Sequence, residues 1–115
     1  MKLPSEAYLL RIFVGESDRS DGKPLHEVIV NEARARGLAG ATVIRGFMGF
    51  GASSRIHTSK VLRLSDDLPI VIEIVDAEDR IEAFLPALDD LIDEGLVTLE
   101  RVRVIAYRHS EGSGR

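Results

Sequence analysis

The sequence predicts an α+β domain with the ferredoxin-like βαββαβ arrangement, a four-stranded antiparallel sheet with two helices on one face. Apolar residues follow strand patterns in some segments and the helical period of about 3.6 in others. The resulting order is strand, helix, strand, strand, helix, strand. Two split strand–helix–strand units with right-handed crossovers produce this topology. The 115 residues suit one domain spanning positions 1–115.

The first half of the chain is expected to form a strand, a helix and a second strand. Ala7 to Val14 has apolar residues on both faces of a strand. Pro24 has the φ angle suited to the first position of a helix, and Gly37 supplies its end. Ala41 to Phe50 is mostly apolar and is expected to be the second strand.

The segments after the second strand are expected to supply two further strand regions. Val61 to Leu64 can form a short strand. Ile70 to Val75 is branched-aliphatic except for Glu73, which is a strong strand signal.

The last part of the chain is expected to form a helix, a strand and a tail. Asp76 can cap the helix, Pro86 should kink it and Gly95 should end it. Val97 to Tyr107 is the expected last strand, and residues from about 108 to 115 read as a frayed tail.

The sheet face opposite the helices also carries apolar residues. Leu9 and Phe13 oppose Leu10 and Ile12 across the first strand, and the strand from Ile70 to Val75 has the same character. Two helices can cover only one face of a sheet. The second face is therefore expected to pack against other subunits.

Composition excludes several classes of function. There is no cysteine, so neither a disulfide framework nor thiolate chemistry is available. The net charge of −4 argues against generic nucleic-acid binding. The apolar run near the N-terminus is short and contains Arg11, so neither a signal peptide nor membrane insertion is expected. We expect a cytoplasmic protein.

Charge is segregated along the chain. Between Ala33 and Ser65 there are six basic residues and no acid, whereas between Asp66 and Glu94 there are eleven acids and one basic residue, Arg80. A local positive field in an acidic protein favours an anionic ligand. A solvated acidic helix face beside a loop that is basic by chance gives the same pattern.

Residues 45–60, RGFMGFGASSRIHTSK, are the candidate anion-binding segment. Glycines allow positive φ and close approach of a ligand to backbone amides, hydroxyls donate to phosphate oxygens, and Arg and Lys supply charge. The candidate ligand-binding residues here are Gly46, Gly49, Gly51, Ser53, Ser54, Arg55 and Lys60. Each type of residue also has an alternative explanation. The glycines could form a strand bulge or bend, the hydroxyl residues could be solvated loop residues, and Arg55 and Lys60 could form ion pairs between subunits.

Other candidate groups lie outside this segment. Arg101 and Arg103 share a face of the last strand and could line a cleft between subunits or pair with acids. His57 is a weak metal candidate, because His26 and His109 are far away in sequence. The cluster of Glu16, Asp18 and Asp21 could hold a hard cation or form a turn.

No catalytic group is predicted. The segment does not match the GxxxxGK[ST] pattern of P-loop proteins. No nucleophile and base can be paired from spacing alone, and no cofactor is predicted.

The chain resembles the family of domain of unknown function 190. The resemblance rests on LLRIFVGESDR, KPLHEVIV, ARGLAGATVIRGFMGFGASSRIHTSKVLRLSDDLPIVIEIVD and IEAFLPALDDLIDEGLVTLERVRVI, and covers Ala7 to Tyr107. It implies a PII-like protein, a trimer of ferredoxin-like subunits. In PII proteins nucleotide binds between subunits at the base of the loop joining the second and third strands, and that loop engages a transporter or enzyme. The corresponding loop here is Gly49 to Lys60.

The function expected from the residues and the resemblance together is regulatory. The protein is expected to be a homotrimer that binds an anionic small molecule, an adenine nucleotide, between subunits and acts through the loop. The alternatives are a trimer that binds divalent metal, as in the CutA proteins, and a small enzyme on the same fold.

Overall fold

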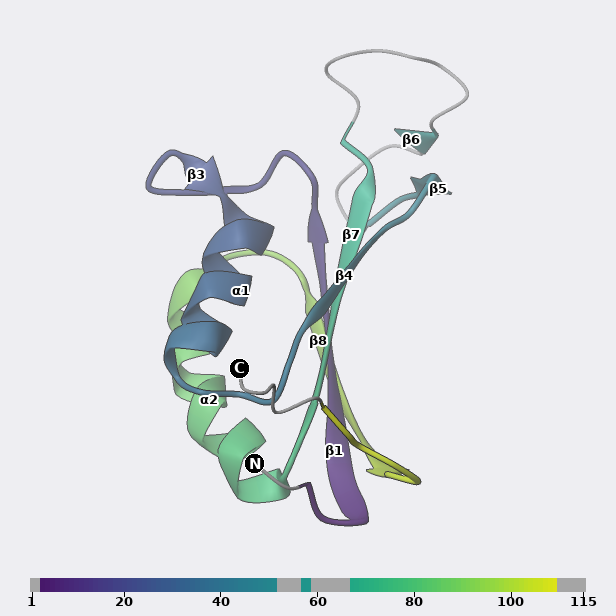
Figure 1. The fold of residues 1–115 in the computed structure, drawn as a ribbon. Coiled ribbons are helices and arrows are strands. Elements are labelled where there is room, and N and C mark those ends of the chain that lie inside the picture. The colour runs from purple at the N-terminus through teal and green to yellow at the C-terminus, as the bar shows by residue number, and fades with distance from the viewer. Residues whose placement is uncertain (1–2, 52–56, 59–66, 110–115) are drawn as a thin grey trace.

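The computed structural model describes residues 3–51, 57–58 and 67–109. The main sheet contains four strands in the order β4-β7-β1-β8, and every neighbouring pair is antiparallel. Two helices pack on one face of this sheet and leave the other face uncovered (Figure 1). The ferredoxin-like fold predicted from the sequence is confirmed. The elements, in chain order, are β1 (Glu6–Gly15), β2 (Arg19–Ser20), β3 (Lys23–Pro24), α1 (Leu25–Ala35), β4 (Thr42–Arg45), β5 (Met48–Gly49), β6 (His57–Thr58), β7 (Pro69–Asp76), α2 (Glu78–Leu91) and β8 (Leu96–Arg103).

The hydrophobic core lies between the sheet and the two helices. Alternate residues of β1 and β7 point toward the helices because side chains alternate along a strand. The helices contribute a stripe at helical spacing to the same layer. The buried members of this core are Leu10, Ile12, Val14, Leu25, Ile29, Ala33, Ile70, Ile72, Ile74, Ile81, Phe84 and Leu88.

Two strands are shorter than the sequence predicts. The segment expected as one strand, Ala41 to Phe50, is divided, because β4 ends at Arg45 and pairing resumes only in the β5–β6 hairpin. β8 ends at Arg103 and not at Tyr107, because its partner β1 begins at Glu6, opposite Arg103. The expected strand from Val61 to Leu64 lies outside the described residues.

The second helix also differs in its ends. The residue at the N-cap position is Ala77, so Asp76 does not occupy the predicted cap. The helix continues through Pro86 and ends at Leu91, before Gly95. Gly95 instead adopts φ 154° in the turn to β8, where a side chain would meet the carbonyl oxygen of Phe13.

Asp76 holds the start of α2 to the loop between α1 and β4. Its side chain is 0% exposed. The carboxylate accepts hydrogen bonds from the amides of Ala39 at 2.9 Å and Ala77 at 2.7 Å, and from Arg80 Nε at 3.2 Å. Arg80 also donates to the carbonyl oxygen of Gly37. Because several donors compensate the buried carboxylate, it can hold the loop between α1 and β4 with only a small desolvation penalty.

Asp76→Asn is expected to lower the free energy of unfolding by about 1–3 kcal/mol, because one buried oxygen becomes a donor that faces other donors. Urea unfolding measures the change. Glu82→Gln on the exposed face of α2 is the matched control and should change stability by less than about 0.5 kcal/mol. Equal losses in the two variants would contradict the role given to Asp76.

Candidate functional site

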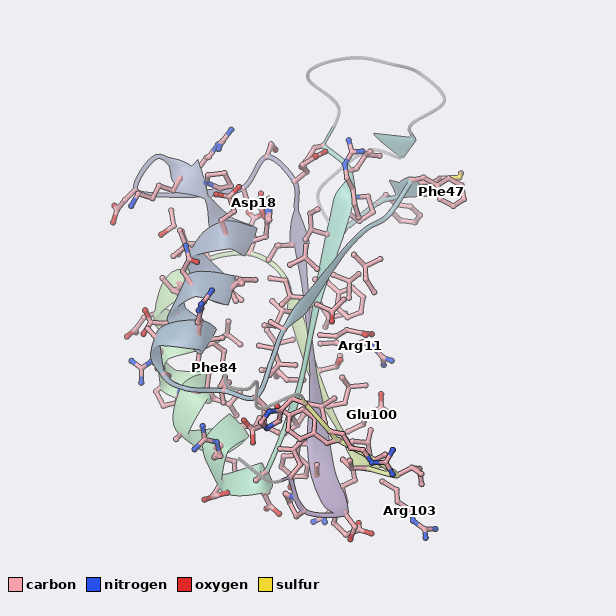
Figure 2. All side chains as sticks on the ribbon, in the orientation of Figure 1. Arg11, Asp18, Phe47, Phe84, Glu100 and Arg103 are labelled. Atoms are coloured by element: carbon pink, nitrogen blue, oxygen red, sulfur yellow. The ribbon has the colours of Figure 1, made fainter. Side chains whose placement is uncertain are left out.

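The β5–β6 hairpin projects beyond the main sheet and carries exposed apolar side chains. Met48 pairs with Thr58 and Gly49 pairs with His57. Phe47, Met48 and Phe50 are all exposed, and Figure 2 shows Phe47 pointing away from the sheet. We call Gly46 to Phe50 the tip. Such exposed aromatic residues in one short segment are typical of a contact surface.

Two predicted glycines of the tip serve packing. A Cβ at Gly46 would lie 2.8 Å from Pro69 Cγ, and one at Gly49 would lie 3.1 Å from the same atom. Neither glycine has φ in the left-handed region, so packing against Pro69 explains the need for glycine at both positions. The amide of Gly46 donates to the carbonyl oxygen of Pro69 at 2.8 Å, which holds the tip on the start of β7.

The remaining predicted residues of the segment are only partly within the structure. Gly51 is described and exposed. The backbone of His57 lies opposite Gly49. Ser53, Ser54, Arg55 and Lys60 lie outside the described residues, so their part in an anion site stays a prediction.

Arg101 and Arg103 lie at the other end of the sheet. Arg101 is opposite Tyr8, and its guanidinium carbon lies 5.5 Å from the centroid of the Tyr8 ring. A hydrogen bond to Glu78 raises the pKa of the Tyr8 hydroxyl, because it favours the neutral form. Figure 2 shows Arg103 at the end of the sheet opposite Phe47. The tip and the two arginines therefore cannot line one site within a single subunit.

A cavity of about 470 Å³ lies near the arginine end of the sheet. It is bounded by the start of β4, the end of β7 and the chain after β8. Tyr107 closes one side, and its hydroxyl donates to the carbonyl oxygen of Ala39 at 3.2 Å. No sequence motif indicates this cavity, because residues after the end of β8 complete it. The lining residues are Leu3, Ala39, Gly40, Ala41, Thr42, Glu73, Val75, Val104, Ala106 and Tyr107.

The uncovered sheet face is only partly apolar. Arg11 occupies its centre, with Nε 2.8 Å from Glu73 Oε2 and Nη1 2.7 Å from Glu100 Oε1. The hydrogen bond to Glu73 raises the pKa of Arg11, and the charge of Glu100 adds to the effect. An apolar row crosses the face beside these charges. Its members, matched across the four strands, are Ile44, Val71, Phe13 and Leu96.

The acidic cluster after β1 has structural partners. Glu16 accepts from Arg45 through two hydrogen bonds of 2.8 and 3.1 Å. Asp18 accepts from the amide of Gly15 at 2.9 Å, and Asp21 adopts φ 50° in the β2–β3 turn. Among the described residues, no group of three or more His, Cys, Asp or Glu side chains could hold a metal ion. In the same part of the chain, no helix is long and apolar enough to cross a membrane.

Comparison with known proteins identifies related chains. The model of the DUF190 family, described as Uncharacterized ACR, COG1993, matches residues 7–104. A UPF0166 protein of Aquifex aeolicus is 42% identical over 97 residues, which are 84% of this chain and 91% of that protein. A UPF0166 protein of Methanocaldococcus jannaschii is 34% identical over 95 residues, 82% of this chain and 87% of that one.

Solved structures with the same fold are more distant in sequence. The nitrogen regulatory PII-like protein CPII of Thiomonas intermedia, bound to ADP, AMP and bicarbonate, is 18% identical with a TM-score of 0.59, and the match covers 86% of this chain and 88% of that chain. CutA of Synechococcus elongatus is 10% identical with a TM-score of 0.55, and the match covers 90% and 81%. These similarities establish a PII-like fold.

Gly46→Ala is expected to lower the free energy of unfolding by about 1–3 kcal/mol, because the added methyl overlaps Pro69. Gly40→Ala is the matched control, since a Cβ there meets no atom within 4 Å. Thermal unfolding of both variants measures the difference. Indistinguishable melting temperatures would show that Gly46 is not required for packing against Pro69.

Proposed function

The chain belongs to the DUF190 family, and from this premise we propose that it is a PII-like regulatory protein. It acts as a homotrimer and binds an anionic small molecule, an adenine nucleotide, in clefts between subunits. The loop at residues 49–60 then engages or releases a transporter or enzyme. The fold shared with CPII, a protein bound to ADP and AMP, supports this proposal.

One observation carries the proposal that the site lies between subunits. The glycine-rich tip and the two arginines of β8 lie at opposite ends of the sheet, as Figure 2 illustrates with Phe47 and Arg103. They can act on one ligand only if one subunit supplies the tip and a neighbour supplies the arginines. The cavity at the arginine end has about the size of a small-molecule site and opens beside the end of β8.

The uncovered sheet face supports assembly. Removing its apolar row from water lowers the free energy and so stabilises an assembly that covers this face. The neighbouring charges of Arg11, Glu73 and Glu100 already satisfy one another, so covering this face would not leave an unpaired guanidinium. A trimer contact on this face would place each tip next to a neighbouring subunit.

Ile44→Glu is expected to shift the protein from trimer to monomer, because it places a charge in the apolar row. Val43→Glu is the matched control. Val43 is the preceding residue of β4, is 41% exposed against 46% for Ile44, and points to the helix side. Light scattering at micromolar concentration measures the mass. A monomeric parent protein would refute the trimer.

Arg101→Gln is expected to weaken nucleotide binding about ten- to a hundredfold, because a charge-assisted hydrogen bond is lost. Arg36→Gln is the control, since Arg36 is the C-cap residue of α1 and pairs with Glu32. Calorimetry with ATP, ADP and AMP measures the affinity. Absence of binding by the parent protein to any of the three at millimolar concentration would exclude a nucleotide site.

A mixing experiment tests whether the site is shared between subunits. Arg55→Gln disables the loop half of the cleft and Arg101→Gln disables the strand half. Random reassembly of the two variants should restore about a quarter of the clefts, because each cleft draws its halves from different subunits. No recovery, with trimers confirmed by light scattering, would place both arginines in one subunit's site or outside the site.

A further inference from the structure

A second groove lies on the helix side of the sheet, between the end of α2 and the edge strand β8. Its volume is about 500 Å³. Helix α2 packs over β1 and β7, the strands next to β8 and beyond it in the sheet. Val97 lies opposite the buried Ile12 and therefore points toward the helix layer, yet it is 40% exposed. We call this feature the α2–β8 groove. Its apolar lining residues are Leu85, Leu88, Ile92 and Val97.

Two carboxylates, Asp89 and Asp93, line the same groove. The last turn of α2 contains no basic residue, although the C-terminal end of a helix carries partial negative charge. No Lys or Arg occurs between Ile81 and Glu100. Within the described part of the chain, neither the Asp89 carboxylate nor the Asp93 carboxylate has an ion pair or a hydrogen-bond partner. Repulsion at this helix end is therefore not offset within the described part of the subunit.

We propose that the α2–β8 groove is a docking site for a short basic segment of a partner protein. Apolar side chains of that segment enter between α2 and Val97, and its Lys or Arg side chains approach Asp89 and Asp93. Charge complementarity selects this occupant. A purely apolar segment would cover two carboxylates without compensating them, and an acidic segment would add to the repulsion.

The strand edge favours an extended conformation for the bound segment. Among the residues that the structure describes, β8 pairs only with β1, so its outer backbone edge has no strand partner in that part of the chain. An added strand would place alternate side chains on the helix side, in line with Val97 and Leu99, which face that side because they oppose Ile12 and Leu10. Arg101 lies on the same side of β8 but opposite Tyr8, near the other end of the strand, so the groove at Val97 and the proposed nucleotide cleft are separated along β8.

The test uses fluorescence anisotropy with a fluorescein-labelled octapeptide of alternating lysine and leucine, at fixed low salt. Binding to the intact protein is expected, and Asp89→Asn combined with Asp93→Asn should weaken it about tenfold. Asp79→Asn combined with Glu82→Gln removes the same charge from the start of α2 and should weaken binding less than about twofold. Val97→Thr keeps the shape of the side chain but replaces a methyl group by a hydroxyl. It should reduce binding of this peptide roughly threefold or more.

Peptides with serine in place of leucine, or glutamate in place of lysine, separate docking from general attraction. Both should bind at least about tenfold more weakly than the parent peptide. Equal binding of the serine peptide, or equal loss in the two charge-matched double variants, would overturn the proposal. A fall in oligomer mass for the Asp89, Asp93 variant in light scattering would also overturn it, because the groove would then be covered by another copy of the chain.

Discussion

The position of β1 at the centre of the sheet constrains most of the structure. It pairs with β7 on one side and β8 on the other. Because side chains alternate along β1, Leu10 and Ile12 enter the core while Arg11 lies between them on the opposite face. A shift of β1 by one residue would bury Arg11 beneath the helices and separate it from Glu73 and Glu100. The core and the charge network therefore select the same register.

The sequence was sufficient to predict the fold because its strongest signals concern buried layers. The branched residues of β7 and the helical stripe ending in Leu88 each correspond to an observed core element. The ends of elements depended on contacts between distant segments. β8 stops where β1 begins, and the break after Arg45 depends on Pro69, a residue more than twenty positions away. Local patterns do not encode such contacts.

The candidate site was predicted less completely for the same reason. Sequence reasoning brought the glycines and hydroxyls together because they are adjacent in the chain. It did not reveal that Arg101 lies far from Gly46 and Gly49, or that Tyr107 lines a cavity after the end of β8. It also treated Glu16 as a possible metal ligand, whereas Glu16 accepts from Arg45 across the top of the sheet. Whether a charged side chain is already paired depends on tertiary contacts.

The packing of Gly46 and Gly49 on Pro69 has a consequence for how this protein can vary. Gly46 and Gly49 lie against Pro69, so the chain is held at the start of β7 both before and after the intervening segment. Near Pro69, the Asp67 carboxylate also accepts a hydrogen bond from the amide of Ser17 at 2.7 Å. For a loop between fixed ends, each doubling of its length raises the entropic cost of closure by only about 0.6 kcal/mol. Insertions and deletions between these anchors therefore impose little penalty on the folded domain. One scaffold can thus carry segments of very different length and composition, and its specificity can diverge without any change in the core.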